Sequence, residues 1–232
     1  PGGPMTDTLR QHPDFDYYLQ DILFWYRNGS AGGSKPIRSH MKAVRTALKA
    51  ALATHPEVRF PEPKTRPVCT HLDRAVDNGA VGPTGRTVRV FSRISEKLRW
   101  EFGYERLPRH LESAYAYAEI LGPRGPVVSE NLIIGVVLLA PRTLYPGHRH
   151  EGLTESYICL SGALSQNDAG VYVPGSLIFN PPQHHHRITT GLFEPCLLSY
   201  AWIGSAEAIA HPKMKFQRSV FSDGNPSARR KS

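Results

Sequence analysis

YPGHRHEGLTESYICLSGALSQNDAGVYVPGSLIFNPPQHHHRITT, residues Tyr145–Thr190, holds five of the eleven histidines in the chain. His148 and His150 lie two residues apart, and His186 follows a short hairpin-like segment. Residues two apart on a strand point to the same face of its sheet. We therefore expect the imidazoles of His148 and His150 to face one interior.

A carboxylate and a phenol accompany these histidines. Glu155 and Tyr157 are also two residues apart, and a bend at Gly152 would bring both pairs of residues into one cavity. Imidazoles with one carboxylate are typical ligands of a divalent first-row metal. The alternative without a metal is a surface HxH pair and a solvated HHH run at 184–186. It does not explain why the histidines, the carboxylate and the phenol occur together at these intervals. The stretch predicts a mononuclear metal site inside a small β-barrel.

The spacing of these residues resembles the two cupin motifs. The first motif runs as H-x-H-x4-E-x6-G from His148 to Gly162, and the second runs from Gly175 through Pro181 to His186. The resemblance implies four metal ligands: His148, His150, Glu155 and His186. Three turn or end positions depart from the motifs and leave the local turn geometry open: Arg142 and Gln183 in place of glycine, and Thr190 in place of asparagine.

The composition is typical of a turn-rich β protein. A length of 232 residues suggests one domain or one domain with an appendage, and 20 Pro and 20 Gly favour turns over a helical bundle. No run is long enough for a membrane span, and the start lacks the pattern of a signal peptide. Three widely spaced cysteines do not make a disulfide framework, so a cytoplasmic protein is expected.

The net charge of +8 raises the question of a nucleic-acid partner. The basic residues are scattered, and their clearest cluster, Arg229–Lys231, lies in a polar tail. No nucleic-acid motif accompanies them. Neither a nucleic acid nor a membrane is expected as a partner.

The chain before residue 114 is predicted to be helical and to pack on the barrel. Residues 1–4 are interpreted as an addition ahead of a natural start at Met5. Residues 14–27 have aromatic and apolar side chains at helical spacing, and Ser39 is the predicted cap of a second helix to about residue 54. Packing is the favoured role of the first helix. A homodimer contact is the alternative, because so many aromatics need a large surface to cover them.

From residue 114 the pattern changes to short strands separated by turns. AYAYAEIL alternates, NLIIGVVLL is a continuous apolar run, and turn signals follow at 122–126, 167–170 and 181–183. The predicted class is mainly β with N-terminal helices (α+β). A helical segment over 5–113 would precede a single cupin domain, a small antiparallel β-barrel over 114–212, and a basic, loop-like tail over 213–232.

Tyr157 is the candidate for acid–base chemistry. A phenol beside a divalent cation ionises more easily and can then act as a general base, although filling the barrel would explain it equally well. Further inward candidates are aromatic, and such walls suit a ligand with a permanent positive charge; core filling explains any single one of them as well. These residues are Tyr145, Phe179, Tyr200 and Trp202.

The barrel half resembles the cupin-type dimethylsulfoniopropionate (DMSP) lyases, and the whole chain most resembles their DddL type. The resemblance rests on the length, the helical N-terminal half, and the segments HRHEGLTESYICLSG and PGSLIFNPPQHHHRI. It implies a carbon–sulfur lyase that converts DMSP, a zwitterion, to dimethyl sulfide and acrylate by β-elimination. The predicted ligands would hold one divalent ion (Zn, Fe, Mn, Co or Ni), Tyr157 would be the base, and His184 would lie near the metal without binding it.

Two other function classes stay open. One is a different metal-dependent cupin enzyme, either a dioxygenase or an isomerase; Glu155 argues against a cysteine dioxygenase, which uses three histidines. The other is a non-enzymatic cupin binding module, which would usually carry a helix-turn-helix. The glycine-rich loop between the two predicted helices is too long for that motif.

Overall fold

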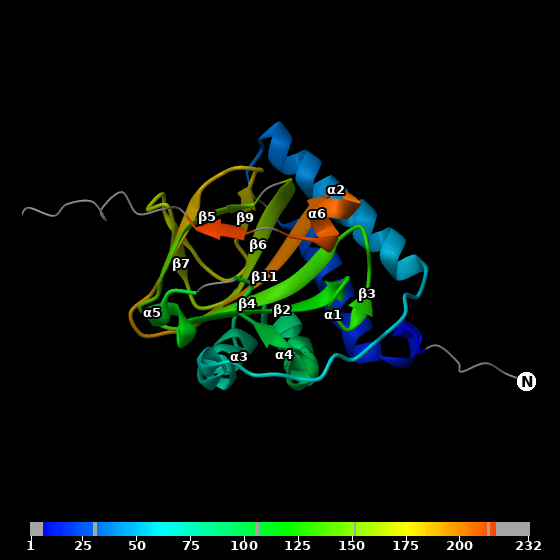
Figure 1. Cartoon of the computed structure of the whole chain (residues 1–232), viewed down its shortest axis with the longest axis horizontal. Coiled ribbons are helices and arrows are strands. Elements are labelled where there is room, and N and C mark those ends of the chain that lie inside the picture. The colour runs from blue at the N-terminus through cyan, green and yellow to red at the C-terminus, as the bar shows by residue number, and fades with distance from the viewer. Residues whose placement is uncertain (1–6, 30–31, 105–106, 151, 213, 217–232) are drawn as a thin grey trace, which may run out of the picture.

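The computed structural model describes residues 7–29, 32–104, 107–150, 152–212 and 214–216 (Figure 1). For residues 148–150 and 214–216 it describes the strands but not the side chains. Residues 1–4 and most of the predicted tail lie outside the described residues.

The N-terminal half is helical, as predicted. α1 (Pro13–Asn28) stops at Gly29, and α2 (Lys35–Ala53) begins earlier than expected because Ser34, rather than Ser39, is its N-cap. No helix among the described residues is both long and apolar enough to cross a membrane. The remaining helical elements are η1 (Leu9–Gln11), η2 (Pro67–His71), α3 (Leu72–Ala80), α4 (Gly85–Ile94), η3 (Ser95–Lys97), α5 (Arg109–Glu112) and α6 (Ala206–Ala210).

The strands form two sheets. One has the order β1-β2-β4-β11-β6-β9 with β3 beside β2, and the other has the order β12-β5-β10-β7-β8. All pairs are antiparallel except β2 with β3. The strands are β1 (Trp100–Glu101), β2 (Tyr115–Gly122), β3 (Val127–Val128), β4 (Ile133–Leu139), β5 (Leu144–His150), β6 (Leu153–Ser161), β7 (Leu164–Gln166), β8 (Val171–Tyr172), β9 (Leu177–Asn180), β10 (His186–Thr190), β11 (Cys196–Gly204) and β12 (Met214–Phe216).

The larger sheet separates two apolar cores. Its inner face meets the smaller sheet, while its outer face is covered by the helices; Figure 1 shows α3 and α4 on the side of β2 and β4 that faces away from β5 and β7. Strand β6 follows this division, since Tyr157 and Cys159 belong to the inner core and Ile158 and Leu160 to the helix side. The expected class, N-terminal helices followed by an antiparallel cupin barrel, is confirmed.

The sheets extend past the predicted barrel limits at both ends. β1 lies before residue 114 and pairs with β2, and β12 lies after residue 212 and pairs with β5. Strands of two and three residues are too short to leave an alternating pattern in the sequence, so neither was predicted.

The three departures from the cupin motifs are accommodated in the backbone. Arg142 and Gln183, which stand where the motifs have glycine, both adopt the left-handed conformation, with φ of 60° and 63°. Thr190 stands where the motif has asparagine; its hydroxyl donates to the Ala140 carbonyl and accepts from the Thr143 amide. The turns that the motifs require are therefore built by other residue types.

The aromatic side chains of α1 divide between the core and the surface. Phe15, Tyr18 and Tyr26 are buried in the helix-side core, whereas Tyr17 and Phe24 are 52% and 56% exposed. The buried set accounts for the packing role predicted for this helix. A homodimer contact through the exposed pair stays a prediction.

Candidate active site

Glu155, Tyr157 and His186 meet inside the barrel, where they connect its two sheets. Glu155 and Tyr157 come from β6 of the larger sheet, and His186 comes from the start of β10 in the smaller one. The His186 Nε2 atom lies 3.0 Å from Glu155 Oε2 and 3.5 Å from the Tyr157 hydroxyl, which also hydrogen-bonds to Glu155. All three side chains are at most 3% exposed. The cluster is therefore shielded from bulk water.

The Glu155 carboxylate is held by neighbours on both adjacent strands. The Trp202 indole N–H of β11 donates to Oε1 at 2.7 Å, and the Asn180 amide of β9 donates to Oε2 at 3.1 Å. Both residues lie directly opposite Glu155 in the strand register. Gln166 donates in turn to the Asn180 Oδ1 at 2.9 Å, which fixes the orientation of that amide. A buried carboxylate needs such donors to remain ionised.

The orientation of the His186 ring suits a metal ligand. Its Nδ1 lies 3.2 Å from the His184 carbonyl, and because a carbonyl only accepts, Nδ1 carries the proton. The Nε2 atom then faces Glu155 Oε2 at 3.0 Å, so the two atoms are directed to one point, as the ligands of a single ion are. The His184 side chain itself is exposed and lies near Asn167, so His184 approaches the site through its backbone.

For the two remaining predicted ligands, His148 and His150, the structure describes the strand β5 but not the side chains. In the register of β5 with β10, His148 lies opposite His186, and β12 runs along the other edge of β5. The side chains of His148 and His150 lie outside the described residues. Among the side chains that are described, no three histidine, cysteine, aspartate or glutamate residues form a metal-binding group. The four-residue ligand set therefore stays a prediction.

Three of the four predicted aromatic walls lie in the barrel interior. Tyr145, Tyr200 and Trp202 are buried in the inner core, and the rings of Tyr200 and Trp202 are 4.9 Å apart between centroids. The structure does not bring Phe179 to this cavity. Asn180 faces Glu155, so its neighbour Phe179 faces the helices, where it packs 5.1 Å from the ring of His40.

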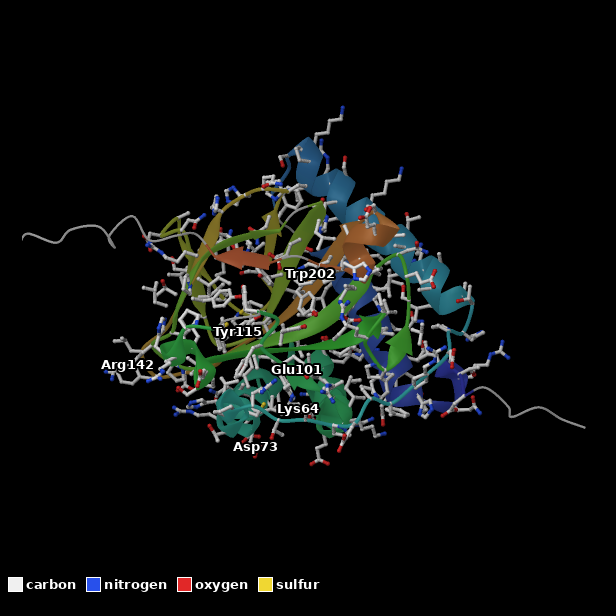
Figure 2. All side chains as sticks on the ribbon, in the orientation of Figure 1. Lys64, Asp73, Glu101, Tyr115, Arg142 and Trp202 are labelled. Carbon is white, nitrogen blue, oxygen red and sulfur yellow. The ribbon has the colours of Figure 1, made fainter. Side chains whose placement is uncertain are left out.

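Further tyrosines extend the aromatic wall beyond those predicted. Tyr115 stacks on Tyr145 at 4.5 Å, the Tyr104 hydroxyl is hydrogen-bonded to that of Tyr145, and Tyr117 meets Tyr200 edge-on at 6.3 Å. Figure 2 labels Tyr115 and Trp202, which both lie on the barrel side of the larger sheet, away from Asp73 of α3. The alternation of AYAYAEIL pairs Tyr115 with Tyr117 but does not say which face is inside, and Tyr104 lies in a loop without any periodic signal.

The phenols of this cavity are neutral in their protein surroundings. Burial holds the pKa of Tyr115, Tyr145, Tyr157 and Tyr200 well above the ordinary value of a phenol. For Tyr157 the negative charge of Glu155 raises the pKa further. A cation at Glu155 would act in the opposite direction and favour the phenolate.

A cavity of about 340 Å³ is lined in part by Trp202. The Arg124 guanidinium borders it and is held by the buried Glu119 carboxylate at 2.9 Å and by the Ala210 carbonyl at 3.0 Å. Its lining is Gly103, Tyr117, Arg124, Trp202, Ala210, His211 and Pro212. The buried cluster of Glu155, Tyr157 and His186, with the aromatic rings in the same core, suits acid–base chemistry on a small, charged ligand.

Two sequence comparisons relate this chain to known proteins. A family model described as dimethylsulfoniopropionate lyase matches residues 40–198. A curated protein of Cereibacter sphaeroides, named as a candidate dimethylsulfoniopropionate lyase DddL, is 50% identical over 207 residues, 89% of this chain and 89% of that protein.

Two solved structures share the fold over nearly the whole chain. One belongs to the crystal structures of the DMSP lyases RdDddP and RnDddQII, with a TM-score of 0.64 and 21% identity over 89% of this chain and 99% of that one. The other is the DMSP lyase DddQ from Ruegeria pomeroyi, with a TM-score of 0.63 and 18% identity over 92% of this chain and 99% of that one. At these identities the likeness concerns the fold.

Proposed function

This chain belongs to the dimethylsulfoniopropionate lyase family of carbon–sulfur lyases, and we propose that it cleaves DMSP by a metal-assisted β-elimination in which Tyr157 is the base. The observation that carries the proposed mechanism is the buried cluster in which Glu155, Tyr157 and His186 meet within 3.5 Å. It supplies a metal-ligand pair and a proton acceptor at one place.

The residues that would hold the metal are His148, His150, Glu155 and His186. Imidazole nitrogens with one carboxylate oxygen accommodate Zn, Fe, Mn, Co or Ni, and the His186 Nε2 that faces Glu155 at 3.0 Å fits such an ion. When bound, the ion would stabilise the negative charge that develops on the substrate carboxylate and so make the neighbouring C–H bond more acidic.

Tyr157 would accept the α-proton of DMSP at its phenolate oxygen. The electron pair of the C–H bond becomes the carbon–carbon double bond of acrylate, and the electron pair of the C–S bond leaves with sulfur as neutral dimethyl sulfide. The proton taken by Tyr157 returns to water before the next turnover. A sulfonium is already a good leaving group, so the site needs one base and no strong acid.

The aromatic walls would bind the sulfonium end of the substrate. Tyr145, Tyr200 and Trp202 belong to the same buried core as Tyr157, and a cation over such rings gains roughly 2 kcal/mol when it is desolvated. Trp202 would serve twice, because its ring forms part of the wall while its N–H holds Glu155. Tyr104 and Tyr115 would extend the wall and keep water away from the base.

The test is to give DMSP to purified protein whose metal content has been measured. We expect dimethyl sulfide in the headspace and acrylate in solution in equal amounts, with activity lost to a chelator and restored by added metal. Release that a chelator does not affect would remove the metal from the mechanism. No release from metal-loaded protein would reject the lyase, and oxygen uptake would then test for a dioxygenase.

A further inference from the structure

A polar cluster on the helix side of the larger sheet contacts β6, the strand that carries Glu155 and Tyr157. Ser156 lies between these two residues, so its side chain points to the helix side of the sheet. The Ser156 Oγ atom is 2.6 Å from the Tyr26 hydroxyl of α1 and 2.7 Å from the His40 Nε2 of α2. The three side chains are at most 5% exposed.

The cluster is a continuous hydrogen-bond chain. Burial lowers the pKa of His40 to about 4, so the ring is neutral and one of its nitrogens accepts while the other donates. If Tyr26 donates to Ser156, then Ser156 donates to His40; in the opposite tautomer, both directions reverse. The Ser156 hydroxyl is satisfied from both sides in either case, and the chain has a defined geometry.

Packing alone does not require this chemistry. Phenylalanine at position 26 and alanine at position 156 would fill nearly the same space without burying two hydroxyls, and burying polar groups gains little stability even when they are paired. What the hydrogen bonds add over apolar contacts is direction. They fix Ser156 relative to two helices, and through its backbone they fix the neighbours on either side.

Among the other contacts of Glu155, His186 belongs to the smaller sheet, whereas the two N–H donors come from the same sheet as Glu155. Asn180 and Trp202 belong to the strands on either side of β6 and would move with it. The helices α1 and α2 restrain β6 from outside this sheet, through Tyr26 and His40. His40 also packs against Phe179 of β9, and Arg45 of α2 donates to the Tyr26 carbonyl at 2.9 Å, which joins the two helices.

We propose that Tyr26 and His40 are positioning residues, which act through Ser156 to orient Glu155 and Tyr157 in the barrel. The helical N-terminal half then sets the geometry of the reaction centre as well as covering the sheet. The inference rests on the function proposed above for Glu155 and Tyr157. A second contact of α1 serves as the comparison, since the Tyr18 hydroxyl donates to Ser199 of β11 at 3.2 Å.

The experiment compares Tyr26→Phe and Ser156→Ala with Tyr18→Phe as the matched control. Each substitution removes one buried oxygen. The first readout is the indole N–H signal of Trp202 in a ¹⁵N–¹H spectrum, identified among the three tryptophans by its loss in Trp202→Phe. That N–H donates to Glu155 Oε1 at 2.7 Å, so its chemical shift reports the position of the carboxylate without any need for metal or substrate.

We expect the Trp202 signal to move in Tyr26→Phe and Ser156→Ala and to stay in place in Tyr18→Phe, with the Trp100 signal unchanged throughout. The second readout is turnover of DMSP, for which we expect kcat to fall about 10- to 100-fold in the two test variants, as for other residues that orient a metal ligand. A folded Ser156→Ala or Tyr26→Phe protein with an unmoved Trp202 signal would overturn the proposal. So would an equal loss of kcat in Tyr18→Phe.

The two proposals fail in different ways. Wild-type protein that releases no dimethyl sulfide rejects the proposed function, while the Trp202 signal still decides whether the cluster positions Glu155. If Tyr26→Phe does not fold, Ser156→Ala, which removes a single oxygen from a strand, carries the test alone.

Discussion

Tyr157→Phe separates the chemical role of this residue from its packing role. The substitution keeps the ring and removes one oxygen, which lies 3.5 Å from His186 Nε2 and is hydrogen-bonded to Glu155. Glu155 retains its donors Trp202 and Asn180, so the loss of this bond should destabilise the fold by only about 1–2 kcal/mol. For a chain of this length that is a fall in Tm of roughly 2–8 °C.

The expected effect on turnover is much larger. A positioned general base contributes about 10²–10⁴-fold to the rate, which corresponds to roughly 2.7–5.4 kcal/mol of transition-state stabilisation. The assay is dimethyl sulfide release at saturating DMSP, with metal content and Tm measured on the same preparation. Tyr145→Phe is the matched control, since it removes a phenolic oxygen of the same cavity and should raise KM while leaving kcat within about tenfold. A Tyr157→Phe protein with normal metal content whose kcat stays within about tenfold of wild type would refute the assignment of the base.

Three further predictions concern His186, Gly135 and Glu101. His186→Ala should lose bound metal when measured by elemental analysis, whereas His185→Ala, an exposed neighbour, should keep it; equal metal in both variants would reject His186 as a ligand. Gly135→Ala should lower the free energy of unfolding by about 1–3 kcal/mol and raise KM, because the added Cβ would lie 2.5 Å from the Tyr200 ring and 2.4 Å from the Ala118 carbonyl; an unchanged Tm would contradict the close packing. Burial acts to raise the pKa of Glu101, but its nearby cations outweigh burial and lower it below the ordinary 4.5. Ionised Glu101 therefore stabilises the fold above that value and ceases to do so as the pH falls through its lowered pKa, so Glu101→Gln should flatten the fall of Tm on acidification; a parallel fall would refute this. The cations are Lys64, Arg66 and Arg99.

Local spacing was enough to predict the fold class and to select the candidate site. The interval from His148 to Gly162 and that from Gly175 to His186 indicate a barrel because they resemble the two cupin motifs. The resemblance holds although three turn or end positions, Arg142, Gln183 and Thr190, depart from the motifs. The backbone at Arg142 and Gln183 still adopts the left-handed conformation, which the motifs assign to glycine.

The sequence pattern could not predict which side chains of a strand point into the barrel. Alternation along β9 says that Phe179 and Asn180 point to opposite sides of the sheet, but not which of them points inwards. The choice of Phe179 as a wall was a choice of face, and the pairing of β9 with β6 decides it in favour of Asn180.

The sequence by itself determined the fold class and which residues could share a face, because both depend on intervals between neighbours along the chain. Only the tertiary structure decided what lies against that face. It brought Asn180 and Trp202 to Glu155, Tyr104 to Tyr145, and two residues of the distant helices, Tyr26 and His40, to the back of β6. Contacts between segments more than a hundred residues apart, such as Tyr26 with Ser156, arise from how helices pack on a sheet, and no periodicity in a single sequence records that packing.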